Sequence, residues 1–229
     1  MKTTYQKTGE YHSSNKTENQ DAIFEAESTS AKVIVIADGV TTCKNGKTGA
    51  EIACQAIGKV LLDETAYIFS SQKRKIAKLL SAYVYRKLRE KSLADNEAVE
   101  SYSSTLSFVC YNKISGETMT FVLGDSLVYS INEGLITLDC NPTIFSNSKT
   151  YCTTTEGVAD VIDINIIPTT NTQRFILATD GAWKTFYKNG ELSKSFVQAA
   201  KSNKIINYLE KQQCQDDCSI VMMDIPKGA

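Results

Sequence analysis

The sequence predicts an α+β protein in which helices cover antiparallel sheets. The first observation is the order of the patterns: strands, two helices, several strands, further helices and a final strand. Helices and strands do not alternate one by one, which argues against a doubly wound parallel sheet. The second observation is that three apolar runs each end on an aspartate, at Asp38, Asp125 and Asp180. Strands that share a core can gather such carboxylates at one rim.

The first part of the chain predicts two paired strands followed by two helices. Residues 20–27 and 31–37 are short apolar runs with a Ser-Thr-Ser turn between them. The Asp-Gly pair that follows could form a hairpin turn, but apolar side chains at helical spacing predict a helix over 48–62. A second helix is predicted over 73–91, with a Lys- and Arg-rich face that we expect to be solvated. The apolar side of this second helix carries Ile76, Leu79, Leu80, Tyr83 and Leu88.

The middle of the chain has a strand pattern. Residues 106–111, 119–123, 127–131 and 135–138 are apolar runs separated by short turn sequences. Four short strands with turns between them predict an antiparallel meander. Residues 140–157 are polar and irregular, so we expect a surface loop there.

The last part of the chain predicts two strands, two helices and a closing strand. Strands are expected over 160–167 and 173–179, and a final strand over 218–225. Helices are expected over 182–187 and 192–211.

Composition excludes several classes of protein. The chain has 229 residues, of which 42% are hydrophobic, enough for one substantial core. No Pro- or Gly-rich linker divides it, so we expect a single domain spanning residues 1–229. The net charge of -1 and the absence of a long basic run argue against nucleic-acid binding. No apolar stretch approaches the roughly 20 residues of a membrane-spanning helix, and the N-terminus lacks a signal-peptide pattern. We therefore expect a cytoplasmic protein without membrane association.

The cysteines favour a reduced protein. Their number, seven, is odd, and most of them lie inside apolar runs, where cysteine acts as a small hydrophobic residue. Cys214 and Cys218 could lie close together, but the chain has one histidine and no second cysteine pair of this kind. A structural zinc site is therefore the weaker interpretation.

The acidic residues predict a divalent-metal site. A fourth acidic position, Asp216-Asp217, opens the last apolar run and joins the three aspartates at strand ends. Clustered carboxylates repel one another and are costly to bury without partners. A bound hard cation with oxygen ligands removes this cost.

The acidic motifs, taken together, resemble a known family. Each fragment is common by itself, but the ordered set is specific and extends from about residue 9 to residue 225. The set resembles the metal-dependent protein phosphatases of the 2C family, most closely its compact bacterial members. The matching motifs are Asn19-Gln20-Asp21, Ala37-Asp38-Gly39-Val40, Gly49-Ala50, Ser104-Thr105-Leu106, Gly124-Asp125-Ser126, Ala178-Thr179-Asp180-Gly181-Ala182-Trp183 and Asp216-Asp217-Cys218-Ser219.

The resemblance implies a four-layer αββα sandwich, in which two antiparallel β-sheets are flanked by helices. It also implies two Mn²⁺ or Mg²⁺ ions at one end of the sandwich. Asp38 would bridge both ions, and the carbonyl of Gly39 would bind one of them. All-oxygen ligands suit these hard cations better than zinc.

The resemblance assigns four further aspartates. Asp180 and Asp216 would bind the other ion, Asp21 would act through a water molecule, and Asp125 would support a weaker third ion together with Asp180. Other interpretations stay open for these residues. Asp125 could lie in a turn between strands, Asp180 could cap the following helix, and Asp216 and Asp217 could be solvated loop acids.

The implied reaction is hydrolysis of phosphoserine and phosphothreonine in proteins, by attack of a metal-bridging hydroxide and without a phosphoenzyme. Asp38 would thus be catalytic as well as a ligand. The implied partners are phosphoproteins and a cognate serine/threonine kinase, and we expect a monomer. Ser104-Thr105 and Trp183 are interpreted as packing residues near the site.

The chain departs from the family pattern at two places. No arginine precedes Arg74, although many members carry one near the chain start to hold the substrate phosphate. His12 and Lys16 are available instead, and His12 could bind phosphate or donate a proton to the leaving alkoxide, unless its role is structural. Gln20 replaces an acid that is common in the family. These departures keep two alternatives open: a pseudophosphatase or phospho-signalling binding module with little turnover, and hydrolysis of a small phosphorylated metabolite.

Overall fold

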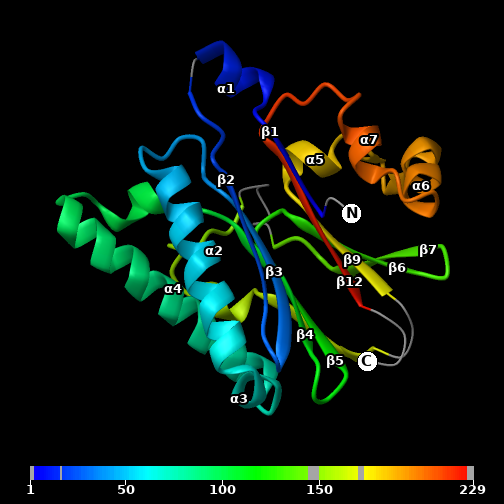
Figure 1. Ribbon diagram of the computed structural model, residues 1–229. Helices are drawn as coiled ribbons and strands as arrows, with labels where there is room; N and C mark the ends of the chain where they lie inside the picture. Colours follow the sequence, from blue (N-terminus) through cyan, green and yellow to red (C-terminus); the bar gives the residue numbers. More distant parts are fainter. Residues whose placement is uncertain (1–2, 16, 144–149, 170–172, 226–229) are drawn as a thin grey trace.

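The computed structural model describes residues 3–15, 17–143, 150–169 and 173–225. Two five-stranded antiparallel sheets lie between two groups of helices, with α2, α3 and α4 on one side and α5, α6 and α7 on the other (Figure 1). This confirms the predicted sandwich of two antiparallel sheets with helices outside. The helices are α1 (Glu10–Asn15), α2 (Gly46–Asp63), α3 (Thr65–Phe69), α4 (Lys73–Asp95), α5 (Asp180–Trp183), α6 (Lys194–Lys201) and α7 (Ile205–Leu209).

Each sheet combines strands from distant parts of the chain. The sheet next to α2 and α4 has the order β2-β3-β4-β5-β8, and the other has the order β1-β12-β9-β6-β7. The strands of the first are β2 (Asp21–Glu27), β3 (Ala31–Asp38), β4 (Leu106–Asn112), β5 (Glu117–Leu123) and β8 (Asp163–Pro168). The strands of the second are β1 (Thr4–Lys7), β12 (Cys218–Ile225), β9 (Gln173–Ala178), β6 (Leu127–Asn132) and β7 (Leu135–Cys140).

The central strands are buried on both faces, because side chains alternate between them. In β3, Ile34 and Ile36 pack against Val221 of the opposite sheet, whereas Val33 belongs to the core beneath the helices. Such strands are nearly continuous apolar runs, which is why the sequence identified them. A further apolar core lies between the second sheet and α5, α6 and α7.

Helix α4 buries three of the five residues in the predicted stripe. Ile76, Leu80 and Leu88 are buried, Tyr83 is half-buried, and Leu79 is 42% exposed. Positions 76, 80 and 88 share one face of the helix, and position 79 lies at its edge. The prediction that Leu79 lies on the buried side was therefore wrong.

The predicted meander is divided between the two sheets. β4 and β5 form one antiparallel pair and β6 and β7 another, but β5 and β6 lie in different sheets. The chain crosses between the sheets at Gly124, whose φ of 109° disfavours other residues. The prediction of a single meander was wrong because the β4–β5 and β6–β7 pairs have the same local sequence pattern. The crossing between the sheets does not change that pattern.

The predicted helices over 182–187 and 192–211 are also corrected. α5 ends at Trp183, and a small hairpin of β10 (Tyr187–Lys188) and β11 (Glu191–Leu192) follows it. Its Asn189-Gly190 turn has positive φ at both residues, the conformation that favours this dipeptide. The second helix is interrupted between α6 and α7, where Asn203 is left-handed with a φ of 59°.

Several elements have no counterpart in the sequence predictions. β1 pairs with β12 at the edge of its sheet, and α1 follows it directly. Short turns of helix cover 99–102 and 158–160, and the latter delays the start of β8 to Asp163. None of the helices in the described part of the chain is long and apolar enough to cross a membrane. All seven cysteines are unbridged, and Cys214 and Cys218 are buried.

Candidate metal centre

Asp21 and Asp38 meet at the end of one sheet. They are directly opposite each other in the β2–β3 register, at the first position of β2 and the last of β3. The Thr105 hydroxyl accepts a hydrogen bond from the Asp38 amide over 2.9 Å, and Thr179 donates to Asp21 Oδ2 over 3.0 Å. Thr105 therefore positions the Asp38 backbone, which is more than the packing role predicted for it. Thr179 comes from the other sheet, so its bond to Asp21 links the two halves of the site.

Asp125 and Asp180 approach from the second sheet. Leu127 pairs with Ala178 in the antiparallel β6–β9 register, so the residues two positions outside this pair meet at the same sheet end. The Trp183 indole donates to the Asp125 carbonyl over 2.8 Å, and Thr150 donates to the Asp125 carboxylate over 3.0 Å. The N-cap of α5 is Thr179, so the interpretation of Asp180 as a cap was wrong.

Asp216 is brought to the same place by close packing at Gly181. A Cβ on Gly181 would lie 2.2 Å from the Asp217 carbonyl oxygen and 2.8 Å from that of Asp216. Only glycine allows the start of α5 to approach the 216–217 segment this closely. The glycine after Asp180 therefore sets the distance between Asp180 and Asp216.

The electrostatics confirm that these aspartates form one cluster. Burial raises the pKa of Asp38 well above its usual range, and the charges of Asp21, Asp180, Asp216 and Asp125 raise it further. Burial also raises the pKa of Asp21, to about 7, and the pKa values of Asp125 and Asp216. For Asp125 and Asp216 the nearby charge of Asp180 adds to the effect of burial. The protein thus concentrates carboxylates where each destabilises the ionised form of the others.

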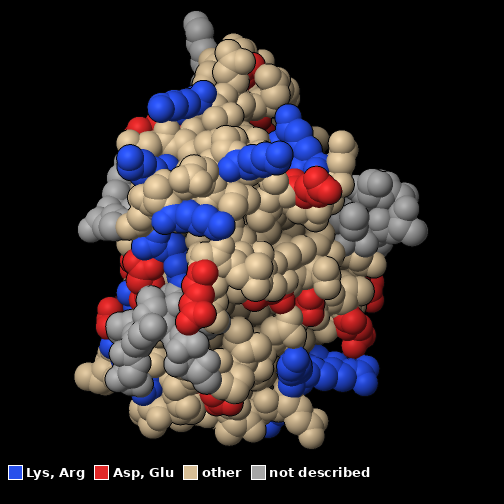
Figure 2. All heavy atoms as spheres, turned by 90° about the vertical axis from the view of Figure 1, so that its right-hand side faces the viewer, with Lys and Arg blue, Asp and Glu red and all other residues tan. Residues whose placement is uncertain are grey.

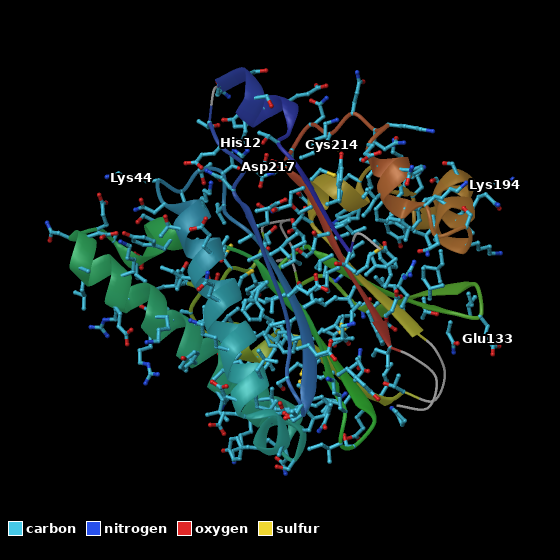
Figure 3. The ribbon with its side chains drawn as sticks, in the orientation of Figure 1. His12, Lys44, Glu133, Lys194, Cys214 and Asp217 are labelled. Carbon is cyan, nitrogen blue, oxygen red and sulfur yellow. The ribbon has the colours of Figure 1, made fainter. Side chains whose placement is uncertain are left out.

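His12 and Asp217 form a buried pair beside the cluster (Figure 3). Asp217 Oδ2 lies 2.7 Å from His12 Nδ1 and accepts from the Gln20 amide over 2.6 Å. The other oxygen of Asp217 accepts from the Gly9 amide over 2.9 Å. Asp217 is 1% exposed, so the interpretation of this residue as a solvated loop acid was wrong.

The cluster fits divalent cations. Asp21 Oδ1 and Asp180 Oδ1 are buried and have no hydrogen-bond partner among the described residues. A buried carboxylate oxygen without a partner is costly, and a cation would satisfy it. Asp216 also lies beside the His12–Asp217 pair, with one potential ligand atom of each of the three residues within 4.8 Å of the others. The carboxylates supply oxygen donors without thiolates, the set that Mg²⁺ and Mn²⁺ prefer.

The structure therefore brings together all five aspartates predicted as ligands, and Gly39 directly follows one of them. Lys16 lies outside the described residues. Sequence reasoning missed the role of Asp217 in holding His12 and that of Trp183 in holding Asp125. It also missed Lys184, whose ammonium pairs with Asp180. The i, i+4 spacing of Asp180 and Lys184 was a signal for that last pair, but the predicted helix over 182–187 did not include Asp180.

Comparison with known proteins identifies the family of the chain. The family model described as Protein phosphatase 2C matches residues 8–216, most of the chain. The chain therefore belongs to the protein phosphatase 2C family. Among curated proteins, none matches the chain.

Several solved structures share the fold of this chain. The catalytic domain of the serine/threonine phosphatase PstP, solved with two manganese ions, matches with a TM-score of 0.69 and 12% identity, over 97% of this chain and 96% of that one. PppA of Pseudomonas aeruginosa, a regulatory component of its T6SS, matches with a TM-score of 0.68 and 14% identity, over 97% and 96% of the two chains. RsbX, solved in complex with magnesium, matches with a TM-score of 0.62 and 12% identity, over 96% of this chain and 92% of that one.

Proposed function

We propose that this protein is a Mn²⁺- or Mg²⁺-dependent phosphatase that hydrolyses phosphoserine and phosphothreonine in proteins. The observation that carries the proposal is the convergence of five aspartates from separate parts of the chain, with two buried carboxylate oxygens left without described partners. Membership of the protein phosphatase 2C family supports the reaction class. The relatives solved with manganese or magnesium support the choice of metals.

The aspartates would hold the ions in the roles expected from the family. Asp38 lies among the other four carboxylates and would hold both ions, one of them together with Asp180 and Asp216. Asp21 approaches from the cross-strand position, and Asp125 would support a third, weaker ion. When bound, such ions neutralise charge on the phosphate oxygens and lower the pKa of a coordinated water molecule.

His12 would serve the leaving group. Its Nδ1 is held by Asp217, so the ring has a fixed orientation. Its Nε2 makes no hydrogen bond to a described residue and is free to hold a proton. In the overall reaction, water adds to phosphorus and the phosphoester bond breaks. The protonated ring would then donate its proton to the departing serine or threonine oxygen, leaving a hydroxyl group and inorganic phosphate.

The test is turnover of p-nitrophenyl phosphate and of a phosphothreonine peptide with and without Mn²⁺. We expect turnover only with the metal, and a loss of at least about 100-fold in Asp38→Asn with the fold retained. Asp63→Asn is the matched control, because Asp63 is exposed at the end of α2 and far from the cluster in sequence. Near-normal activity of Asp38→Asn would contradict the assignment.

The same experiment separates the alternatives. A folded protein that binds Mn²⁺ and the phosphopeptide but releases no phosphate at micromolar concentration would be a pseudophosphatase or binding module. Faster release from small phosphorylated metabolites than from any phosphopeptide would show that the substrate is not a protein.

A further inference from the structure

A cavity opens directly beside the aspartate cluster. Its volume is about 580 Å³, and its lining includes Gly181 and Asp216 from the cluster itself. Tyr11 also lines it, and the Tyr11 ring meets the His12 ring edge-on, with centroids 5.4 Å apart. A phosphorylated residue bound at the cluster would therefore place its neighbouring residues in this cavity.

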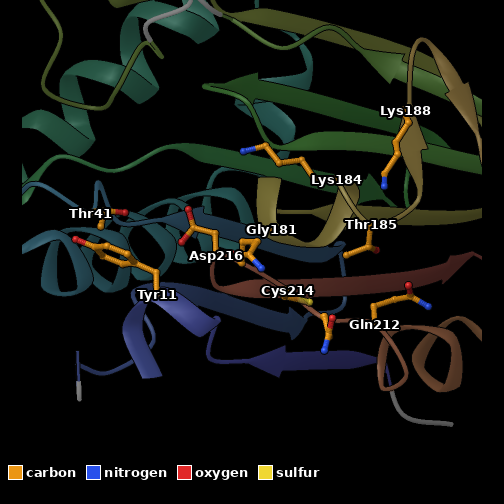
Figure 4. A pocket seen from close by; sticks show the side chains of 11 residues that line it. Tyr11, Thr41, Gly181, Lys184, Thr185, Lys188, Gln212, Cys214 and Asp216 are labelled. Carbon is orange, nitrogen blue, oxygen red and sulfur yellow. The ribbon is translucent and has the colours of Figure 1, made fainter. Parts of the chain in front are cut away.

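The wall of the cavity carries two lysines. Lys184 directly follows α5 and Lys188 is the last residue of β10. Figure 4 shows both on one side of the cavity, with Gln212 and Cys214 opposite. Lys184 pairs with Asp180 at the edge of the cluster. Lys188 is exposed and makes no hydrogen bond or ion pair within the described part of the chain. Its ammonium is therefore available to a bound anion.

The part of the chain that contributes both lining lysines carries an excess of positive charge. Residues 184–211 contain six lysines and two glutamates, a local net charge of +4 in a chain whose net charge is -1. All six lysines are exposed. The face that carries α6 and α7 shows Lys and Arg side chains gathered mainly in its upper half (Figure 2). Such a field attracts acidic partners and repels basic ones.

We propose that this cavity binds acidic residues next to the phosphorylated residue, so that the enzyme favours acidic phosphopeptides. The inference rests on the proposed phosphatase function and names the class of protein substrate. Lys188 would pair directly with a carboxylate of the peptide, and the other lysines would steer it to the site. The neutral amides of Gln212 and Gln213 line the same cavity and can donate further hydrogen bonds to a carboxylate.

The test compares phosphothreonine peptides that differ only in their flanks: neutral, acidic before the phosphothreonine, acidic after it, and basic on both sides. We expect kcat/KM for one of the acidic peptides to exceed that for the neutral one by about fivefold at low salt, mainly through KM. The preference should weaken at high salt, because exposed charges are screened. Equal values for all four peptides would overturn the proposal.

Variants locate the effect. Lys188→Gln should lower the acidic preference to about half or less and Lys188→Glu should abolish it, whereas Lys78→Gln on α4, behind the other sheet, should leave it unchanged. Hydrolysis of p-nitrophenyl phosphate, which lacks flanking residues, should be the same in Lys78→Gln as in the natural protein, and it serves as the reference rate for each Lys188 variant. If the Lys188→Glu variant still preferred acidic peptides, the cavity would not be the site that binds the residues next to the phosphorylated residue.

Binding separates this proposal from the proposed activity. Fluorescence anisotropy with labelled peptides and Mn²⁺ measures the preference even if no phosphate is released. Tighter binding of an acidic peptide, lost in Lys188→Glu, would support the docking site in an inactive protein. Turnover without any dependence on the flanks would retain the phosphatase and overturn the docking site.

Discussion

The roles of Asp217 and His12 are determined by the groups that surround them in the folded protein. Asp217 is buried beside a predicted ligand, yet its oxygens accept from two amides and lie against one imidazole nitrogen. A carboxylate with these partners is satisfied without a cation. Its neighbour Asp216 points at the cluster and the cavity, so two adjacent aspartates have different tasks.

This division of tasks predicts the effect of removing the histidine. We expect His12→Ala to lower kcat by about 100-fold while Mn²⁺ affinity changes little, because the ring would supply a proton and not a ligand. Initial rates and calorimetric titration with Mn²⁺ measure the two quantities. A loss of metal affinity in parallel with kcat would argue against the proton donor.

A second residue-scale prediction concerns Asp139 in β7. Its Oδ2 is buried without a described partner, and burial raises the pKa of Asp139 to about 6, although Ser130 donates to its other oxygen over 2.9 Å. The folded protein thus favours the protonated form. The resulting stability is present below about pH 4 and is lost as the pH rises through 6.

Asp139→Asn keeps the shape and the oxygen that accepts from Ser130, but has no charge. We expect it to raise the free energy of unfolding by about 1–2 kcal/mol at pH 7.5 and to change it little at pH 4. Urea denaturation at both pH values measures this, with exposed Asp63→Asn as the control. Equal effects at both pH values would contradict the prediction.

At the scale of elements, helix α2 determines the position of a segment next to the site, which contains Ser103 and Ser104. A Cβ on Gly49 would lie 1.9 Å from the backbone oxygen of Tyr102. The helix therefore passes close to the turn at 99–102, and this turn leads directly into the Ser104–Gly39 bridge and the bond from Asp38 to Thr105.

We expect Gly49→Ala to destabilise the protein by about 2 kcal/mol or more, although alanine is the better helix former, because two backbones would have to separate. It should also lower activity, since a displacement of the turn at 99–102 would move Thr105 and with it the Asp38 backbone. Lys59→Ala, at an exposed position of the same helix, should change stability by less than about 0.5 kcal/mol. Chemical denaturation and p-nitrophenyl phosphate turnover provide the two readouts.

The elements also show why sequence patterns failed where they did. The Asn189-Gly190 turn was a recognisable hairpin signal, but the apolar residues around it also fit a helix of period 3.6. The β5–β6 crossing had no comparable signal, because either sheet could accept either pair. Lys188, on which the docking proposal depends, lies in this hairpin, between the ranges 182–187 and 192–211 in which helices were predicted.

At the scale of the whole molecule, the site joins the two sheets. Asp21 and Asp38 belong to one, and Asp125, Asp180 and Asp216 to the ends of strands in the other. Without cations their charges repel across the junction. Bound ions would therefore stabilise the whole sandwich and not a single loop.

We expect Mn²⁺ at 100 times its dissociation constant to stabilise the protein by about 2.7 kcal/mol per independent site, and EDTA to reverse the effect. Thermal unfolding and calorimetric titration should show about two ions per chain. Asp38→Asn should be more stable than the natural protein without metal, because one repelling charge is gone, and should gain less from Mn²⁺. An identical Mn²⁺ effect on both proteins would place the metal elsewhere.

The sequence by itself determined which residues are chemically available and where strands end. Buried strands need apolar runs, and the aspartates stand at their ends in an ordered set that resembles the protein phosphatase 2C family. Only the tertiary structure decided which of these groups meet. Register and sheet membership depend on contacts between residues far apart in the chain, which local patterns do not encode. The pairing of His12 with Asp217 forms only when both sheets pack together around one core. The position of the lysines beside the cluster also depends on that packing.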